Sequence, residues 1–403
     1  MLHIAIAAGL ILGLVVGLAA SATGNETLLA IANGSAPFGT IFINAIRMVV
    51  LPLIMTVIFT SIARLGDPRK LGRIGGMTLA FYWITLIPAI IIGMGVMKIG
   101  LQFSPAIDMP SAAVADMPPL PGIVDFLVSL VPANPFAAAS SGAILPVIVF
   151  TALVAAATGT LESDRRERMI TLADDASQAL MKLVWWILYI APIGVFGLAA
   201  PVIAKLGWDL VISLGVFIVS VFSGLLVLMI VMYLPLLYFV AKLGPARFLA
   251  STFGAVSIAF STTSTAAAIP VSLEETTKKL NVSESIADLL IPLGASMYRP
   301  GSALFQGAAI VFLAHLYGVP IPAAAVGAAI LATFLVSLTV APVPSSGVVT
   351  LMPALEAVGV PVAGLSFLLG IDRIPDMMRS AVNVLGQIMT AVLVDRWTAD
   401  ETE

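Results

Sequence analysis

Long apolar stretches recur along the chain and are separated by short polar connections. Several of these stretches have close to the ~20 residues that a helix needs to cross a bilayer. They are residues 2–20, 37–63, 77–101, 143–158, 183–204 and 209–241. They do not alternate with the period of two that membrane strands show. The pattern therefore predicts an all-α polytopic membrane protein whose first stretch is retained as a membrane span.

Basic residues in the connections predict the orientation of these spans. Residues 21–36 contain no Lys or Arg, whereas the next connection holds Arg64, Arg69, Lys70 and Arg73. The later connections at 165–168, 242–247 and 278–279 are also basic, and the loop that ends near residue 124 is not. Because short cytoplasmic loops are enriched in Lys and Arg, we expect both termini and the basic loops to lie in the cytoplasm of a cell-membrane protein.

Two later apolar stretches are interrupted by tips rich in Ser, Thr, Pro and Gly. The first tip is Ser261–Thr265, which precedes Pro270, and the second is Pro342–Gly347. Each half of these stretches is too short to cross the bilayer. Paired interruptions of this kind are typical of the central site of a transporter, where broken backbone lines a cavity. The sequence thus predicts two re-entrant helical hairpins, with two loops at the membrane surface as the alternative.

The span between these hairpins, residues 285–316, carries its own interruption at Ser296–Ser302. Pro300 removes a backbone donor and Gly301 frees the backbone, so the helix is expected to unwind there. Arg299 then lies near the middle of the span, where an unpaired charge costs several kcal/mol. Its distance from both ends argues against the alternative in which the side chain extends to the membrane surface.

The last span, residues 361–394, carries a stripe of polar side chains on one helical face. Spaced by 4, 3, 4 and 4, they are Asp372, Asp376, Arg379, Asn383 and Gln387. Arg373 lies off this face. An acid, acid, base, amide and amide inside a membrane helix indicate a substrate site, although a purely structural network is the alternative.

The chemistry of this stripe suits an acidic amino acid. Arg379 offers a planar fork that can donate two hydrogen bonds to one carboxylate. Asp376, one turn earlier, can hold an ammonium group, and Asn383, one turn later, can bind a second carboxylate. Asp372 is expected to orient Arg379. The ligand inferred from these groups has one amine and two carboxylates, as aspartate and glutamate do.

Composition excludes several other classes of function. Hydrophobic residues make up 60% of the chain and charged residues 10%, against about 25% charged in soluble domains. With no cysteine and two separated histidines, His3 and His315, we expect no metal site and no cofactor, and we expect no nucleic-acid partner. An intramembrane enzyme is the weakest alternative, because both acids share one helix. A channel leaves the polar stripe without a role, and a sensor would need an appended soluble domain to relay its signal, which we do not expect.

Several motifs resemble the glutamate transporter family, the dicarboxylate/amino acid:cation symporters, over nearly the whole chain. They are Asn134-Pro-Phe136 followed by Leu145-Pro146, Ala191-Pro-Ile-Gly-Val-Phe196, Pro292-Leu-Gly-Ala295, and Arg379-Ser-Ala-Val-Asn-Val-Leu-Gly386. The resemblance implies eight transmembrane helices plus two re-entrant hairpins, a homotrimer, and transport by an elevator mechanism. It also implies that the second hairpin is the extracellular gate.

The resemblance further implies a division into two kinds of domain. Residues 1–76 and 126–205 correspond to the scaffold and trimerisation parts. The third span, within residues 77–125, belongs with residues 206–403 to the moving transport domain, which holds the sixth span, both hairpins, the broken seventh helix and the eighth.

Position by position, the resemblance assigns roles at the site. Arg379 would bind the substrate's side-chain carboxylate, Asp376 its amino group and Asn383 its main-chain carboxylate. Ser302 matches a family threonine at the side-chain carboxylate, and the tips would add further contacts: Ser264, Thr265, Val343 and Gly347. Dicarboxylate-specific members of the family usually lack the acid that corresponds to Asp376, so its presence favours an amino acid. Arg373, in contrast, resembles a feature of the dicarboxylate-specific members. A C4-dicarboxylate substrate therefore remains the alternative.

The chain departs from the family where its sodium-coupled members bind cations. Those members read Asn-Met-Asp-Gly-Thr where this chain reads Tyr298-Arg-Pro-Gly-Ser302, and they carry a further acid at the position of Gln387. Tyr82 and Thr85 match another part of the cation cluster. Both acidic ligands are absent and one positive charge is gained, so the hypothesis is that Arg299 is a built-in cation that replaces coupling sodium.

Three kinds of coupling stay open. Sodium-independent uniport or exchange needs no further group. Proton coupling would use Asp372 or Asp376 as the titrating carboxyl group. A residual sodium site could be formed by backbone carbonyls near the second hairpin.

Overall fold

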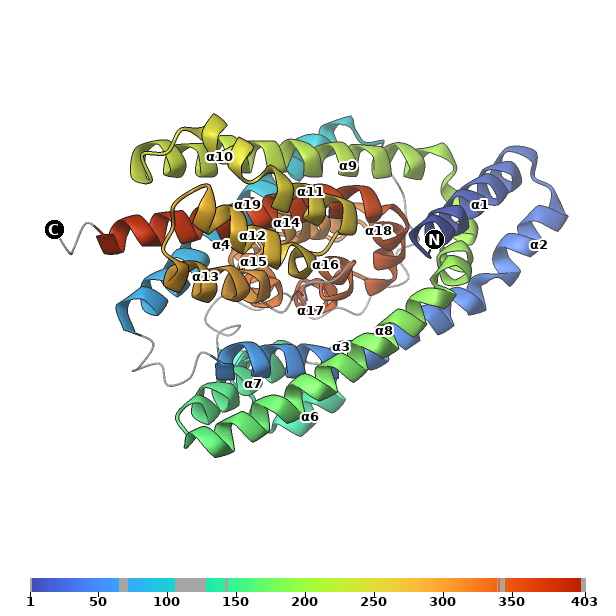
Figure 1. Ribbon diagram of the computed structural model, residues 1–403. Coiled ribbons are helices and arrows are strands. Elements are labelled where there is room, and N and C mark those ends of the chain that lie inside the picture. Colours follow the sequence, from blue (N-terminus) through green and yellow to red (C-terminus); the bar gives the residue numbers. More distant parts are fainter. Residues whose placement is uncertain are drawn as a thin grey trace.

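The computed structural model in Figure 1 describes residues 2–64, 72–105, 128–141, 144–338, 340 and 345–399. All the regular secondary structure in these residues is helical. This confirms the all-helical class that the apolar pattern predicts. Many helix bounds also lie within a few residues of the predicted spans.

One group of helices packs along the long helix α8. Its members are α1 (Leu2–Thr23), α2 (Glu26–Gly34), α3 (Ala36–Arg64), α7 (Ile144–Gly159) and α8 (Ser163–Leu206), with the short α6 (Pro135–Ser140) against α7. Figure 1 shows α3 and α8 side by side, leading away from the body that contains α19. A Cβ at Gly9 would overlap the carbonyl group of Pro192, so glycine allows α1 to approach α8 closely.

Helix α8 differs from the predicted span at 183–204. It starts at Ser163, about twenty residues earlier than expected from the apolar stretch, and bends by 52° between Ile187 and Tyr189. The added segment is rich in Asp, Glu, Arg and Ala. These are mostly good helix formers that carry no apolar signal, so hydropathy could not show that the helix continues.

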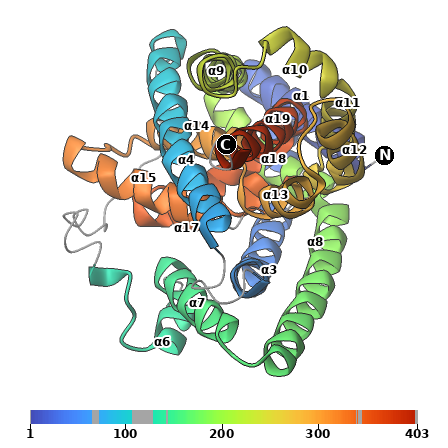
Figure 2. The same ribbon diagram turned by 60° about the vertical axis from the view of Figure 1, so that its left-hand side comes forward.

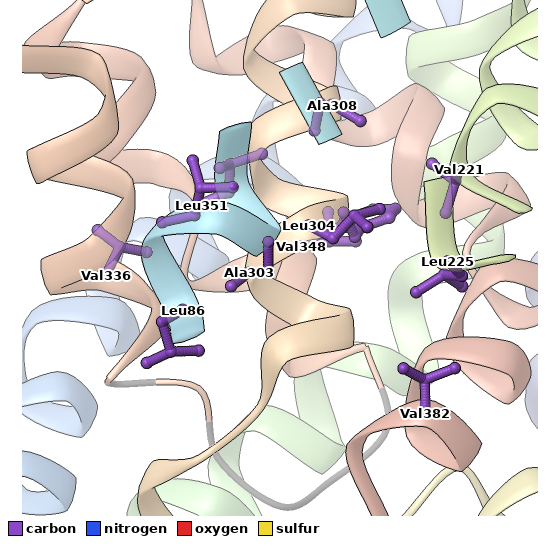
Figure 3. Close-up of a cluster of buried hydrophobic side chains, with 14 of the residues drawn as sticks. Leu86, Val221, Leu225, Ala303, Leu304, Ala308, Val336, Val348, Leu351 and Val382 are labelled. Atoms are coloured by element: carbon purple, nitrogen blue, oxygen red, sulfur yellow. The ribbon is translucent and has the colours of Figure 1, made fainter. Parts of the chain in front are cut away.

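A second group surrounds α14 (Pro300–Leu316). It contains α4 (Gly72–Gly100), α9 (Trp208–Leu228), α13 (Glu284–Met297) and α19 (Arg373–Ala399), and α9 continues as π-helical turns at Met229–Tyr233 and Leu236–Val240. Figure 3 shows the core of this group, where apolar side chains from α4, α9, α15, α16 and α19 surround α14. Gly93 and Gly307 let α4 and α14 touch, because a Cβ at either would overlap a carbonyl group of the other helix. Close packing of this kind holds helices together within a bilayer.

Two helical pairs occupy the positions of the predicted hairpins. The first consists of α11 (Phe253–Thr262) and α12 (Thr265–Lys278), which pack on each other after the short α10 (Pro245–Ser251). In the second, α15 (Ala323–Ser337) packs on α17 (Met352–Ala357), and the short α16 (Ser346–Val349) lies at the tip. Figure 2 shows α11 and α12 on one side of α19 and α15 on the other.

The final predicted span, 361–394, is divided in the structure. A 3₁₀ turn at Val362–Gly364 and α18 (Leu365–Ile371) precede α19. Asp372 lies at the junction, where its carbonyl oxygen accepts a 2.8 Å hydrogen bond from the backbone N–H of Asp376. The polar stripe therefore begins at the junction and continues along α19.

Three helical segments of the described residues are long and apolar enough to cross a membrane, and the bent α8 pair makes a possible fourth. The three are Gly76–Phe103, Trp208–Val240 and Arg373–Thr398. Shorter apolar helices include Ala8–Thr23, Pro146–Gly159 and Phe253–Thr262. The chain is thus a multi-span membrane protein, and the count of eight spans stays a prediction.

Candidate functional site

Helix α19 is the most buried of the long apolar segments. In its membrane-length window 89% of the residues are buried, against 39% in the windows of α4 and α9. All five residues of the polar stripe are at most 6% exposed. Buried charges inside a membrane protein need partners, and other parts of the structure supply them.

An acid–base cluster forms the first part of the stripe. Arg379 donates to Asp376 Oδ1 from Nε at 3.0 Å and from Nη2 at 2.8 Å, and Nη2 also lies 2.9 Å from Asp372 Oδ1. The guanidinium carbon lies 4.1 Å from the ring centroid of Phe305, over its face. Nη1 of Arg379 has no hydrogen-bond partner among the described residues. One donor of the fork is therefore open to a further acceptor.

The tip of the second hairpin lies directly over this cluster. The backbone N–H of Ser345 donates to Asp376 Oδ2 at 3.0 Å. A Cβ at Gly347 would lie 3.3 Å from Cζ and Nη1 of Arg379, so only glycine leaves the space beside the guanidinium open. Gln306 on α14 donates from Nε2 to the carbonyl of Gly347 at 3.1 Å and to Thr350 Oγ1 at 3.2 Å. Val343 lies outside the described residues.

The unwound junction before α14 is joined to the middle of the stripe by Asn383. Its Oδ1 accepts from the backbone N–H groups of Gly301 and Ser302 at 2.8 and 3.3 Å, and its Nδ2 donates to Ser302 Oγ at 3.1 Å. The amide therefore satisfies the open N-terminus of α14. A Cβ at Gly301 would lie 2.7 Å from the carbonyl oxygen of Arg379, which explains the glycine at this crossing.

Gln387 at the end of the stripe meets an aromatic cluster. Its Nε2 donates to the carbonyl oxygen of Tyr298 at 3.1 Å. The Tyr298 ring stacks on Tyr82 with centroids 4.2 Å apart, and its hydroxyl accepts from Thr85 Oγ1 at 3.0 Å. The structure thus brings together four residues that the sequence placed in a cation cluster, and an amide N–H faces the carbonyl at the break.

Arg299 occupies the break between α13 and α14. Its side chain is buried, with 3% exposed, and Nη2 donates to the carbonyl oxygen of Ala295. The charge also interacts with those of Asp376 and Arg379. The side chain therefore lies inside the protein, as the mid-span position predicted, and two acids and two arginines balance the formal charge of the site.

The tip of the first hairpin approaches the other side of α19. Thr265 is 3% exposed and its hydroxyl has no hydrogen-bond partner among the described residues, while Ser264 caps α12 by accepting from the Ala267 N–H at 3.3 Å. Arg373 donates at 2.8 Å from Nη1 to Thr263 Oγ1 and from Nη2 to the Ser261 carbonyl. The side chain that lies off the stripe therefore joins α19 to this tip.

Three contacts of the site have no counterpart in the sequence analysis. They involve the ring of Phe305, the amide of Gln306 and the N–H of Ser345. Gln306 could have been identified from the sequence as a candidate site residue, because it is the single amide in the apolar run that follows Ser302. The other two gave none, because one is a common core residue and the other contributes only its backbone.

The chain matches a family model over most of its length. Residues 2–397 match the model described as the Sodium:dicarboxylate symporter family. The match includes the described helices of both packing groups and the whole polar stripe.

Individual relatives are similar at close to 30% identity over nearly the whole chain. The Proton/glutamate-aspartate symporter of Escherichia coli (strain K12) is 29% identical over 378 residues, 91% of this chain and 86% of that protein. The Proton/sodium-glutamate symport protein of Geobacillus stearothermophilus is 30% identical over 411 residues, 98% of this chain and 94% of that protein. The C4-dicarboxylate transport protein of Anaeromyxobacter sp. (strain K) is 29% identical over 408 residues, 99% of this chain and 90% of that protein.

Proposed function

Because the chain belongs to the sodium:dicarboxylate symporter family, we propose that this multi-pass membrane transporter carries L-aspartate or L-glutamate across the cell membrane. It is a transporter and not an enzyme. The observation that supports the substrate is the buried cluster of Asp372, Asp376 and Arg379 beneath the tip of the second hairpin. Relatives named as glutamate and aspartate symporters support the same class.

Each polar group of the cluster has a proposed part in binding. The open Nη1 of Arg379 donates to the side-chain carboxylate, and Asp376 exchanges part of its present bonding for the substrate ammonium. Asn383 receives the main-chain carboxylate, Ser302 contacts the side-chain carboxylate, and the buried hydroxyl of Thr265 adds a donor. Because two acids and two arginines balance, an amino acid adds one net negative charge where a dicarboxylate adds two. The balanced site therefore favours the amino acid.

Movement of one body against another is the proposed transport step. Helices α1, α3, α7 and α8 pack mainly on each other, and so do α4, α9 and α14, while α19 packs on α14, α13 and the first hairpin. We assign the first group to the proposed scaffold parts, 1–76 and 126–205, and the second to the proposed transport domain, 77–125 with 206–403. An elevator-like shift of the second group in each protomer of a homotrimer would carry the whole site, with the second hairpin as gate.

Sodium independence is the proposed energetic property of this chain. A site for sodium must supply oxygen ligands that replace the hydration shell of the ion. Here the Tyr298 carbonyl accepts from Gln387 Nε2, and the Ala295 carbonyl accepts from Arg299. Two carbonyl oxygens near the break thus already bond to N–H donors, and the guanidinium supplies a fixed positive charge. Arg299 would replace the coupling cation for an anionic substrate.

The decisive experiment is a calorimetric titration of purified protein with aspartate in sodium chloride and in choline chloride. We expect the same affinity in both salts, and a collapse in choline would overturn sodium independence. Titration with glutamate and succinate in the same buffers tests the substrate itself. Binding of succinate alone would overturn the amino acid assignment whatever the sodium result.

Proton coupling is the favoured source of energy if sodium has no effect. Five similar relatives carry the word proton in their names, three of them together with sodium, and Asp372 and Asp376 are the carboxylates available at the site. Uptake of aspartate into proteoliposomes should rise with an inwardly directed proton gradient. Equal uptake with and without that gradient would instead indicate uncoupled transport or exchange.

A C4-dicarboxylate substrate is the second candidate. It is supported by the relative named as a C4-dicarboxylate transport protein and by Arg373, a further arginine at the start of α19. In the structure, however, the guanidinium of Arg373 is bonded to the first hairpin tip. Competition between succinate and aspartate in the titration distinguishes the two candidates.

A further inference from the structure

A cavity of about 430 Å³ opens between α4, α14 and α15, away from the polar stripe. The three helices contact one another in pairs, and Figure 2 shows them together on one side of the molecule. Nine of the lining residues are apolar or glycine and two are basic. They are Ile91, Met94, Gly95, Lys98, Val311, Ala314, His315, Val319, Ile321, Val326 and Ile330.

The apolar part of the cavity has the dimensions of a short stretch of acyl chain. Ile91, Met94, Gly95 and Lys98 follow the spacing of one helical face on α4. Seven residues of rise give about 10 Å along the helix axis, so the groove can accommodate a chain of several methylene groups. A Cβ at Gly95 would have no atom within 4 Å, which shows that the space beside this residue is open.

Both basic residues lie at the same end of the cavity. Lys98 is in the last turn of α4 and His315 in the last turn of α14, and both side chains are exposed. The residues that line the cavity include no acid. A lysine ammonium and an imidazole N–H therefore provide donors for an anion at the mouth of an apolar groove. A cation at a helix C-terminus also interacts with the helix dipole, but that interaction requires no groove.

We propose that this cavity binds one anionic phospholipid, with part of an acyl chain in the groove and its phosphate at Lys98 and His315. The bilayer supplies such a ligand, and α4 faces outward over most of its membrane-length window, where 39% of residues are buried. Charge complementarity selects an anionic headgroup over a zwitterionic one.

The site has a direct structural link to the second hairpin. Val326 and Ile330 belong to α15, the first helix of that hairpin, whose tip bonds to Asp376. A bound lipid chain would therefore pack on the hairpin that covers the cluster.

Native mass spectrometry of delipidated protein in detergent tests this proposal, with dioleoyl phosphatidylglycerol, dioleoyl phosphatidylcholine and oleate as probes. We expect phosphatidylglycerol to bind more tightly than the other two. Lys98→Gln and His315→Gln should each weaken its binding, by about fivefold for the lysine. Gly95→Leu should block the groove without disturbing its neighbours. All variants should retain aspartate binding, which shows that they are folded.

Matched controls lie outside the cavity. Lys205→Gln removes a basic residue from the last turn of α8, and Gly215→Leu adds a side chain where a Cβ likewise meets no atom within 4 Å. Neither should change lipid binding. Equal binding of phosphatidylglycerol and phosphatidylcholine, preferred binding of oleate, or equal effects of the control and cavity variants would overturn the proposal.

Discussion

The two hairpin tips are built alike but are held by different side chains of α19. Each tip contains one residue in the left-handed region, Thr263 with φ 55° and Ser345 with φ 60°. Arg373 donates to the first tip, and Asp376 accepts from the backbone of the second. Both tips are therefore joined to the same helix within one turn.

The difference lies in what else each of these side chains contacts. Arg373 is half-buried, and its guanidinium donates two hydrogen bonds to the first tip. Asp376 is buried and also forms the ion pair with Arg379. A substrate that competes for Asp376 must act on the second tip and can leave the first unchanged. If the proposed function is right, the second hairpin is therefore the gate, because its contact with Asp376 is the one that the substrate would share.

The largest effect is expected from Arg379→Met. The substitution removes the guanidinium that is proposed to bind the substrate carboxylate, and it takes the ion-pair partner away from Asp372 and Asp376. Loss of one partner of a buried pair costs about 3–5 kcal/mol. We expect aspartate binding to fall more than about 100-fold, measured by calorimetry and by uptake into proteoliposomes.

A control separates this loss from misfolding. Combining Arg379→Met with Asp372→Asn removes one of the uncompensated charges and should recover thermal stability, but not binding. Recovery of aspartate binding in the double variant would show that Arg379 only balances Asp372.

The next largest effect is expected from Asp376→Asn. This variant distinguishes the two roles of Asp376, which are to hold the second tip and to bind the substrate ammonium. The amide oxygen can still accept from the Ser345 N–H, whereas the charge that would hold the ammonium is lost. We expect aspartate affinity to fall about 10- to 100-fold and succinate affinity to change much less, in a calorimetric comparison. Asp372→Asn is the matched control, and an equal loss there would remove the special role of Asp376.

Much of the site was predictable because it is periodic. The spacing from Asp372 to Gln387 places five polar groups on one face, and Pro300 with Gly301 marks the break beside them. The contacts between segments were not predictable. Arg373 meets Ser261 across 112 positions and Gln306 meets Gly347 across 41, and such pairings depend on how the helices pack, which one sequence does not specify.

The fold shows the same limit of prediction. Apolar runs predicted helices such as α1 and α3 because those segments are mainly apolar along their whole length. Hydropathy did not show the extension of α8 to Ser163 or the division before Asp372. In both places the backbone follows local helix propensity or packing, neither of which changes the apolar pattern.

A smaller effect is expected from Gln306→Leu, which weakens the support of the second tip without touching Asp376. The side chain loses hydrogen bonds to Gly347 and Thr350, each of about 0.5–1.5 kcal/mol. We expect aspartate affinity to fall about tenfold. The chain has no cysteine, so thiol labelling of Ser346→Cys reports on this tip alone. The labelling rate should be higher when Gln306→Leu is also present.

Gln178→Leu is the matched control for that prediction. Gln178 is an exposed amide on α8 that donates to Asp174, so its replacement should change neither affinity nor labelling. An unchanged labelling rate in Gln306→Leu would show that other contacts hold the second tip.

The smallest effect on transport is expected from Arg373→Gln, which tests the opposite half of the comparison. Loss of its bonds to Thr263 and Ser261 should raise thiol labelling of Ala266→Cys, beside the first tip, about fivefold. Aspartate affinity should stay the same, because this arginine contacts the tip and not the cluster. If Arg373 instead bound a second substrate carboxylate, the variant would lose succinate binding, and succinate would protect Ala266→Cys in the parent chain. That result would make both tips substrate-linked, and neither could then be identified as the gate from its contact with α19.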